Sequence, residues 1–161
     1  MILIVADAGP VNYLIQTGHV GVLAVLAGRV VLPVSVRAEL LHRGAPDAVR
    51  AWASALPDWV EVLAARESIE APDISAADRE AIALARELSA SLLLMDDQQA
   101  RRCAAALGVV TIGTAGILEA AAARGLVVLP EALEKLKATS CFLSEEIIGN
   151  ALRRDAERSA R

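Results

Sequence analysis

Aromatic side chains are scarce in this chain of 161 residues, where Phe, Trp and Tyr together make up 2% of the sequence. The core must therefore be built from Ala, Leu, Val and Ile, and such small side chains suit helices packed closely on a central sheet. Cysteine is also rare, and Cys103 and Cys141 show no metal-ligand spacing. This low cysteine content is typical of a reducing compartment, so we expect a cytoplasmic protein.

Lysine occurs only at positions 135 and 137, so arginine carries nearly all the positive charge. The net charge of −4 is unlike that of a basic nucleic-acid coat protein, but it leaves room for a nuclease whose acids bind metal. An apolar fraction of 55% with 22% charged residues indicates a globular chain. No apolar run is long enough to cross a membrane, and the short apolar start meets Asp7 at once, unlike a secretion signal.

Several motifs of nucleotide-binding and nucleophilic enzymes are missing. Gly9 alone follows the first apolar run, so the sequence lacks G-x-G-x-x-G there, and it has no Gly-Lys-Ser/Thr phosphate loop. A phosphoacceptor receiver domain would need paired acids after the first strand and a lysine late in the sheet, and neither is present. His19 and His42 lie near no Ser or Cys motif, so nucleophilic catalysis has no support.

Strand and helix signals alternate along the chain, and the apolar runs are continuous. Continuous apolar runs indicate strands buried on both faces of a parallel sheet. We therefore predict an α/β protein, a three-layer α/β/α sandwich with a central, mainly parallel sheet and C-terminal helices. Strands are expected at 2–6, 30–32, 91–95 and 109–112, with an edge strand at 59–62. Helices are expected at 10–17, 20–27, 34–43, 44–55, 76–89, 97–107, 114–124, 130–138 and 144–157.

Single acids stand where apolar runs end or where helices begin. Asp7 ends the first strand, Asp96 and Asp97 end another, and Glu39 and Asp78 lie near the starts of two expected helices. Ligands of parallel sheets gather beyond the carboxyl ends of the strands. Carboxylates gathered there with no basic partner of their own suggest a magnesium or manganese site, because such ions prefer carboxylate and water oxygens.

Each of these acids also has an ordinary structural role open to it. Asp7 and Asp96 are placed to cap the helices that follow them, and Asp97 would then lie in a first helical turn, where the helix dipole favours an acid. Glu39 is spaced four residues from Arg43, as in a helix-surface ion pair. Position alone leaves these structural roles and the metal-binding role both open.

Two acids near residue 80 compete for the same role. Ser75 and Asp78 have the spacing of a capping box, yet helical projection places Asp78 beside Ile82 on the apolar side. Glu80 projects toward solvent, so Asp78 is the preferred site residue and Glu80 the reserve. Thr114 would add a hydroxyl at the same end of the sheet, unless it only caps the following helix.

Taken in order, these segments resemble the PIN-domain family, a metal-dependent ribonuclease fold that includes VapC-type toxins of prokaryotic toxin–antitoxin pairs. The similarity covers about residues 2–125, and the chain looks most like short PIN-like proteins that end in extra helices. Gly9 departs from the hydroxyl residue that many members carry two positions after the first Asp. The matching segments are Ile4–Pro10, Val31–Val36, Glu39–Leu40, Asp78–Ala85, Leu93–Asp97, Ala100–Gly108 and Ile112–Leu118.

The resemblance implies a metal-dependent endoribonuclease acting on RNA. Its metal site would hold one or two Mg²⁺ or Mn²⁺ ions on four acids, with Asp97 as an outer ligand. Asn12, Thr114 and Arg101 would contact a phosphate or a metal-bound water. The four acids are Asp7, Glu39, Asp78 and Asp96.

The family also bears on domains and partners. Residues 1–125 would form the PIN-like domain and residues 126–161 a helical extension packed on it. A toxin of this kind would be silenced by an antitoxin protein. Apolar helices at 10–17 and 20–27 predict a homodimer, unless the C-terminal helices cover them. The alternative function is a non-catalytic PIN-like module that binds protein or RNA.

Overall fold

Five parallel strands form one sheet in the computed structural model, which describes residues 2–161. Their order across the sheet is β3-β2-β1-β4-β5, so β3 lies at an edge, as the sequence predicted. The last strand is shorter than expected and begins two residues late. The strands are β1 (Leu3–Ala6), β2 (Arg29–Pro33), β3 (Val60–Leu63), β4 (Leu92–Leu94) and β5 (Thr111–Ile112).

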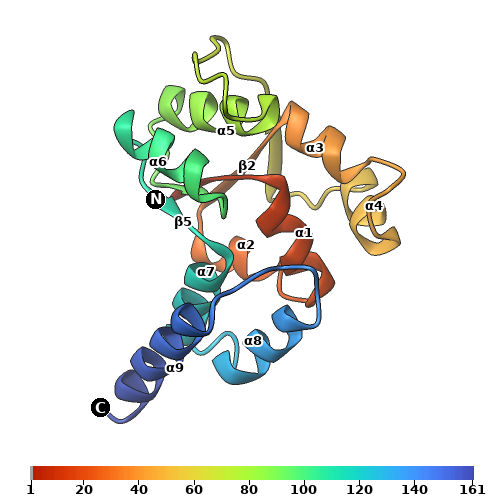
Figure 1. Cartoon of the computed structure of the whole chain (residues 1–161). Coiled ribbons are helices and arrows are strands. Elements are labelled where there is room, and N and C mark those ends of the chain that lie inside the picture. Colours follow the sequence, from red (N-terminus) through yellow and green to blue (C-terminus); the bar gives the residue numbers. More distant parts are fainter. Residues whose placement is uncertain (1) are drawn as a thin grey trace.

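Helices cover both faces of this sheet, which confirms the predicted three-layer α/β/α sandwich (Figure 1). The first helices are α1 (Ala8–Gln16), α2 (Val22–Leu26), α3 (Val34–Leu40) and α4 (Asp47–Ser54). Those of the second half are α5 (Ala76–Glu87), α6 (Gln98–Ala106), α7 (Thr114–Ala123), α8 (Leu129–Lys137) and α9 (Glu145–Ser159).

Alternate residues of each central strand enter two separate hydrophobic cores. In β1, Ile4 belongs to the core shared with α1, α7 and α8, whereas Val5 belongs to the core shared with α5 and α6. All three residues from Ile4 to Ala6 are at most 1% exposed. Burial on both faces explains why the strand sequences are apolar without alternation, since neither face meets water.

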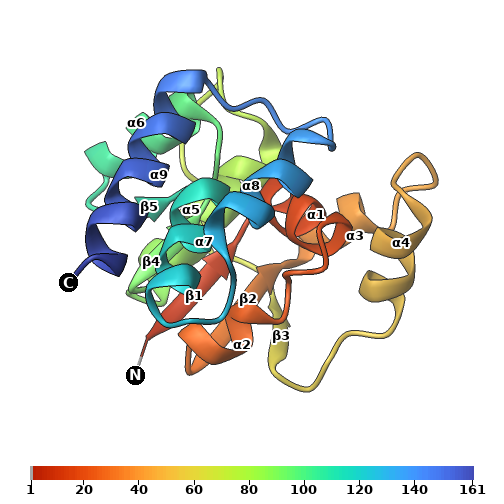
Figure 2. The same ribbon diagram turned by 90° about the horizontal axis from the view of Figure 1, so that it is seen from below.

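The C-terminal helices pack on the same side of the sheet as α1 (Figures 1 and 2). Leu133 of α8 and Ile148 of α9 lie in the core that also contains Leu14 of α1. Arg154 of α9 makes a two-pronged ion pair with Glu119 of α7, through contacts of 2.6 and 3.0 Å. These helices are therefore joined to the sheet domain by buried apolar contacts as well as by surface charges.

The apolar helices α1 and α2 are partly covered within the chain itself. Helix α7 contacts both of them, and Leu14 and Leu23 are almost fully buried. A homodimer therefore stays a prediction that rests on the remaining exposed residues of this region, such as Val25. Within the described part of the chain, no helix has the length and apolar character needed to span a lipid bilayer.

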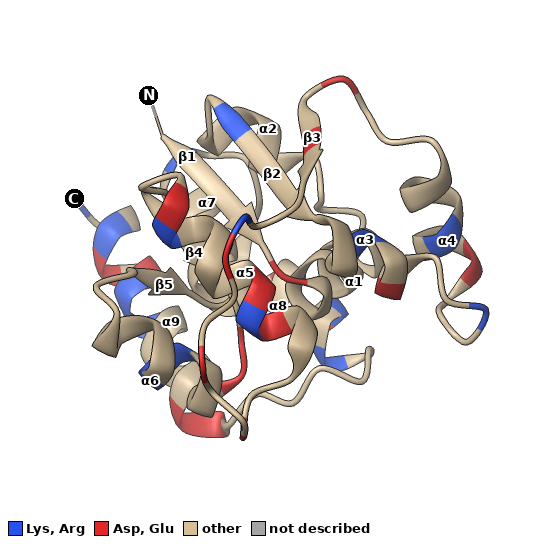
Figure 3. Ribbon diagram, turned by 90° about the horizontal axis from the view of Figure 1, so that it is seen from above, with Lys and Arg blue, Asp and Glu red and all other residues tan. Residues whose placement is uncertain are grey.

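Strand register brings the first and fourth strands to the same edge. Ala6 of β1 lies opposite Leu94 of β4, and the backbone N–H of Asp7 donates to the Leu94 carbonyl at 2.9 Å. The segments that carry Asp7 and Asp96 therefore leave the sheet side by side. Figure 3 shows acidic stretches gathered where β1 ends and α5 begins.

Candidate active site at the carboxyl edge of the sheet

Asp7 is a buried acid with no structural use for its side chain. It is the residue before α1, yet its carboxylate makes no capping hydrogen bond to that helix. The residue is only 7% exposed, and no salt bridge to it occurs among residues 2–161. The Asp7 side chain therefore does not cap α1, although the sequence left that role open. Keeping a buried carboxylate ionised without a cationic partner costs free energy.

Neighbouring carboxylates increase that cost. Burial first, and then the charge of Asp78 and a hydrogen bond between the two carboxyl groups, raise the pKa of Asp7 to about 8. The charge of Glu39 adds to this rise, while the N–H of Ala8 opposes it. Burial and the charge of Asp78 also raise the pKa of Glu39. The structure thus brings Asp7, Asp78 and Glu39 into electrostatic contact.

Helix α5 supplies Asp78 from its first turn. The hydroxyl of Ser75 accepts a hydrogen bond from the Asp78 backbone N–H at 3.2 Å, which is the capping contact that the sequence predicted. Capping fixes the first turn of α5 and so fixes where Asp78 leaves it. The backbone of Asp78 serves the cap, while its carboxylate faces Asp7.

Glu80 points elsewhere, and not to solvent as helical projection suggested. Its carboxylate accepts a long hydrogen bond of 3.5 Å from the backbone N–H of Ser35, at the start of α3. Projection failed here because α3 packs against α5 and supplies a donor on that side. The structure therefore brings Asp78 to Asp7 and directs Glu80 toward α3.

Asp96 and Asp97 have other structural roles than those the sequence suggested for them. Asp97, not Asp96, caps α6, because its carboxylate accepts from the Ala100 N–H at 2.8 Å. Asp96 reaches across to α7, where it accepts from the Thr114 N–H at 2.7 Å and from the Thr114 hydroxyl at 2.6 Å. Thr114 is fully buried, so this pair fixes the Asp96 carboxylate firmly.

Gly113 makes room for that arrangement. A Cβ atom at this position would lie 2.9 Å from Oδ1 of Asp96 and 3.3 Å from Nη1 of Arg101. The guanidinium of Arg101 is held from its other side, where Nε donates to the Thr111 hydroxyl at 3.0 Å. Arg101 and Asp96 therefore both approach Gly113, and they line a common pocket of about 310 Å³.

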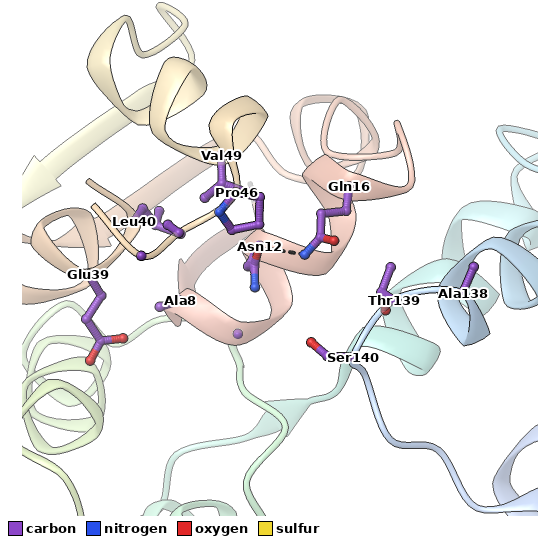
Figure 4. A pocket seen from close by; sticks show the side chains of 13 residues that line it. Ala8, Asn12, Gln16, Glu39, Leu40, Pro46, Val49, Ala138, Thr139 and Ser140 are labelled. Carbon is purple, nitrogen blue, oxygen red and sulfur yellow. Dashed lines mark hydrogen bonds between the residues drawn. The ribbon is translucent and has the colours of Figure 1, made fainter. Parts of the chain in front are cut away.

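A larger pocket, of about 570 Å³, lies on the α1 side of the acids (Figure 4). Asn12 and Glu39 line it, and the Asn12 side chain accepts a hydrogen bond from Gln16 at 2.8 Å. Thr139 and Ser140, from the segment between α8 and α9, form the opposite wall. No local sequence signal identifies these two residues, because only the fold brings them beside the start of α1.

The same segment also approaches Asp96. Burial, and next the charge of Asp96, raise the pKa of the Cys141 thiol to about 11. The next residue, Phe142, lines the smaller pocket with Asp96. Residues 139–142 therefore extend from one pocket to the other across the carboxyl edge.

The acids have the chemistry that a divalent cation requires, although they do not form a complete coordination site. Among residues 2–161, no three Asp, Glu, His or Cys side chains stand in positions that could hold a metal ion. Asp7 and Asp78 nevertheless form a converging, partly buried pair of hard oxygen ligands without a basic partner. A divalent ion bound between them would attract both carboxylates and so stabilise their ionised forms.

Comparison with known proteins agrees with the architecture. A family model described as PIN domain matches residues 3–157, which includes α8 and most of α9. A solved structure of a PilT N-terminus domain protein, from the hyperthermophilic archaeon Sulfolobus solfataricus, is similar with a TM-score of 0.54 and 19% sequence identity. That similarity covers 83% of this chain and 95% of the archaeal chain, and it supports the fold. No curated protein matches the chain.

The raised pKa of Asp7 predicts how stability changes with pH. The folded chain holds this proton up to a pH of about 8, whereas an unfolded aspartate releases it near 3.8. Each pH unit between these values therefore lowers the free energy of unfolding, by about 1.4 kcal/mol at most. Asp7→Asn should remove that slope and raise the melting temperature of the metal-free protein, more at pH 8 than at pH 5.

Thermal unfolding in EDTA across this pH range measures the effect. Asp58→Asn is the matched control, because Asp58 is exposed and precedes β3 at the opposite end of the sheet. If Asp7→Asn and Asp58→Asn show the same pH slope as the wild type, Asp7 is not the titrating group.

The Thr114 hydroxyl should contribute measurably to stability. Thr114→Val deletes the 2.6 Å hydrogen bond to Asp96 within a fully buried site. We expect the free energy of unfolding to fall by about 1–3 kcal/mol in urea denaturation. Thr114→Ser keeps the hydroxyl and should recover most of that loss. A Thr114→Val variant as stable as the wild type would show that the hydroxyl contributes nothing, and a larger loss in Thr114→Ser than in Thr114→Val would assign the stability to the methyl group.

Proposed function

The chain belongs to the PIN-domain family, and on that premise we propose that it is a metal-dependent ribonuclease that hydrolyses RNA with Mg²⁺ or Mn²⁺. One observation carries the proposal, namely the buried Asp7 carboxyl, which lies against Asp78 and forms no salt bridge among residues 2–161. Carboxylates that repel each other destabilise a fold, so a chain that keeps them at the ligand-binding edge of its sheet has a use for them.

In this proposal Asp7 and Asp78 form the central pair of ligands. Glu39 and Asp96 complete the set, with Asp97 as an outer ligand. When bound, the ion supplies a water of lowered pKa and offsets charge on the attacked phosphate. Thr114 restrains Asp96 through two hydrogen bonds, so this acid keeps its direction. Glu39 lies on the exposed side of α3, and its long side chain is free to turn toward the pair.

Both pockets beside the acids suit a nucleotide chain. Besides Glu39, the larger one has uncharged polar side chains in its lining, including Asn12, Gln16 and Thr139, which can hydrogen-bond sugar or base edges. The smaller one holds Arg101, whose planar guanidinium matches a phosphate. The acids lie between the two pockets, so an RNA strand that crosses the carboxyl edge of the sheet would pass one pocket, the acids and then the other pocket. A toxin role, an antitoxin partner and a homodimer stay predictions drawn from the family resemblance.

Cleavage of a mixed RNA pool by the purified chain tests the proposal. We expect cleavage with Mn²⁺, none with EDTA, and a loss of about 100-fold or more in Asp7→Asn and in Asp78→Asn, because each removes a metal ligand. Asp58→Asn should cleave like the wild type, since that exposed acid lies at the other end of the sheet.

Mn²⁺ titration calorimetry on the same samples separates the alternatives. Cleavage that survives EDTA and both variants would contradict the metal mechanism. An absence of both Mn²⁺ binding and cleavage, with RNA still bound, would identify the non-catalytic RNA-binding module instead.

Arg101 should contribute through its position and not only through its charge. Arg101→Ala removes a guanidinium that lies beside Asp96, so we expect kcat/KM for RNA to fall by about tenfold. Arg102→Ala is the matched control, because Arg102 is exposed and does not line the pocket. Equal losses in the two variants would mean that the arginines act only as a diffuse positive charge.

A further inference from the structure

Phe142 is the aromatic residue whose placement is least favourable for folding. It is the one phenylalanine in the sequence, and it is 90% exposed. The other rings, Tyr13, Trp52 and Trp59, are partly buried against the hydrophobic core. Leaving a large apolar ring in water forgoes the hydrophobic gain of burying it. In a chain with so few aromatic residues, this exposure points to a use outside folding.

The backbone on both sides of Phe142 is restrained by hydrogen bonds and packing. Thr139 accepts a hydrogen bond from the Cys141 N–H at 3.1 Å and donates its own to the Leu136 carbonyl at 2.6 Å. Ser144 caps α9 by accepting from the Ile147 N–H at 3.1 Å. Cys141 and Leu143, on either side of the ring, pack against the core. The backbone of Phe142 is therefore fixed, and presenting its side chain to a ligand costs little ordering entropy.

The surroundings of the ring are mixed in a way that suits a nucleotide. Phe142 lines the pocket of about 310 Å³ together with Arg101, Gln98 and Asp96. Ile147, which is 43% exposed, forms an apolar part of the same wall. Extruded bases stack between aromatic and apolar side chains while cationic groups take the neighbouring phosphate. Protein-binding hot spots are also rich in aromatic and arginine side chains, so it is the position of Phe142 in one pocket with Asp96, a proposed metal ligand, that favours a nucleotide.

We propose that Phe142 is a stacking platform for a base of single-stranded RNA beside the cleaved phosphate, with Arg101 on the phosphate of that nucleotide. This inference rests on the proposed ribonuclease function. It assigns substrate binding to the segment between α8 and α9, and it makes RNA with unpaired bases the substrate class. Stacking tolerates any base, so this contact favours single strands over duplexes without selecting a sequence.

The test measures RNA affinity without cleavage. All variants carry Asp7→Asn, and fluorescence anisotropy follows a labelled, mixed-sequence eight-nucleotide RNA in the presence of Mn²⁺. We expect Phe142→Ala to weaken binding about tenfold and Phe142→Trp to preserve it, because indole also offers a flat ring. Val128→Ala is the matched control, since Val128 is 60% exposed, lies at the start of α8 and lines neither pocket. Its affinity should be unchanged.

Two further measurements test whether the ring stacks on a base. An RNA with abasic linkers in place of nucleotides should bind equally weakly to the Asp7→Asn protein with and without Phe142→Ala. RNA should also quench the fluorescence of Phe142→Trp more than that of the protein with only Trp52 and Trp59. A solely structural role for the ring would produce neither result.

The outcomes separate this inference from the proposed function. Metal-dependent cleavage by the wild type, with unchanged RNA affinity in Phe142→Ala, would overturn the stacking platform alone. The exposed ring would then be a contact for a protein partner or a second copy of the chain. If the wild type neither cleaves nor binds RNA, the ribonuclease proposal fails and the platform fails with it.

Discussion

The cost of ionising Asp7 beside Asp78 is the constraint on which the candidate site depends. No basic side chain among the described residues pairs with Asp7, and burial makes this cost higher than it would be in water. The fold tolerates this cost because two apolar cores lock the central strands on both faces. A sheet held in this way can keep unfavourable charges in place at its edge, where a flexible loop would let them separate.

The late part of the chain completes the site that the early part begins. Helices α8 and α9 join the core beside α1, and this docking carries residues 139–142 over the carboxyl edge. Two pockets result, one on each side of the acids, and each has a wall from this segment. The match to the PIN-domain family model continues to residue 157, so that model includes α8 and most of α9.

The sequence predicted the strands well because their signals are local, and it placed the acids by the same local signals. Continuous apolar runs give buried parallel strands, and each acid stands next to such a run or to a helix start. It failed where a distant element supplies the partner, as with Asp96 on Thr114 and Glu80 on Ser35. It also missed Phe142, since the exposure of one ring depends on how α8 and α9 dock. Patterns in a single sequence do not predict contacts between residues that lie far apart along the chain.

Gly113 shows how a residue with no functional group can control one. Its backbone lies in an ordinary extended conformation, so alanine would fit the chain locally. The missing side chain instead leaves space that Asp96 and Arg101 occupy together. A methyl group there would push an acid and a base apart at once, with little effect on the remainder of the sheet. In a mutational scan, substitutions of Gly113 would therefore be tolerated as poorly as those of the charged residues beside it. Natural variation at this position should be limited for the same steric reason.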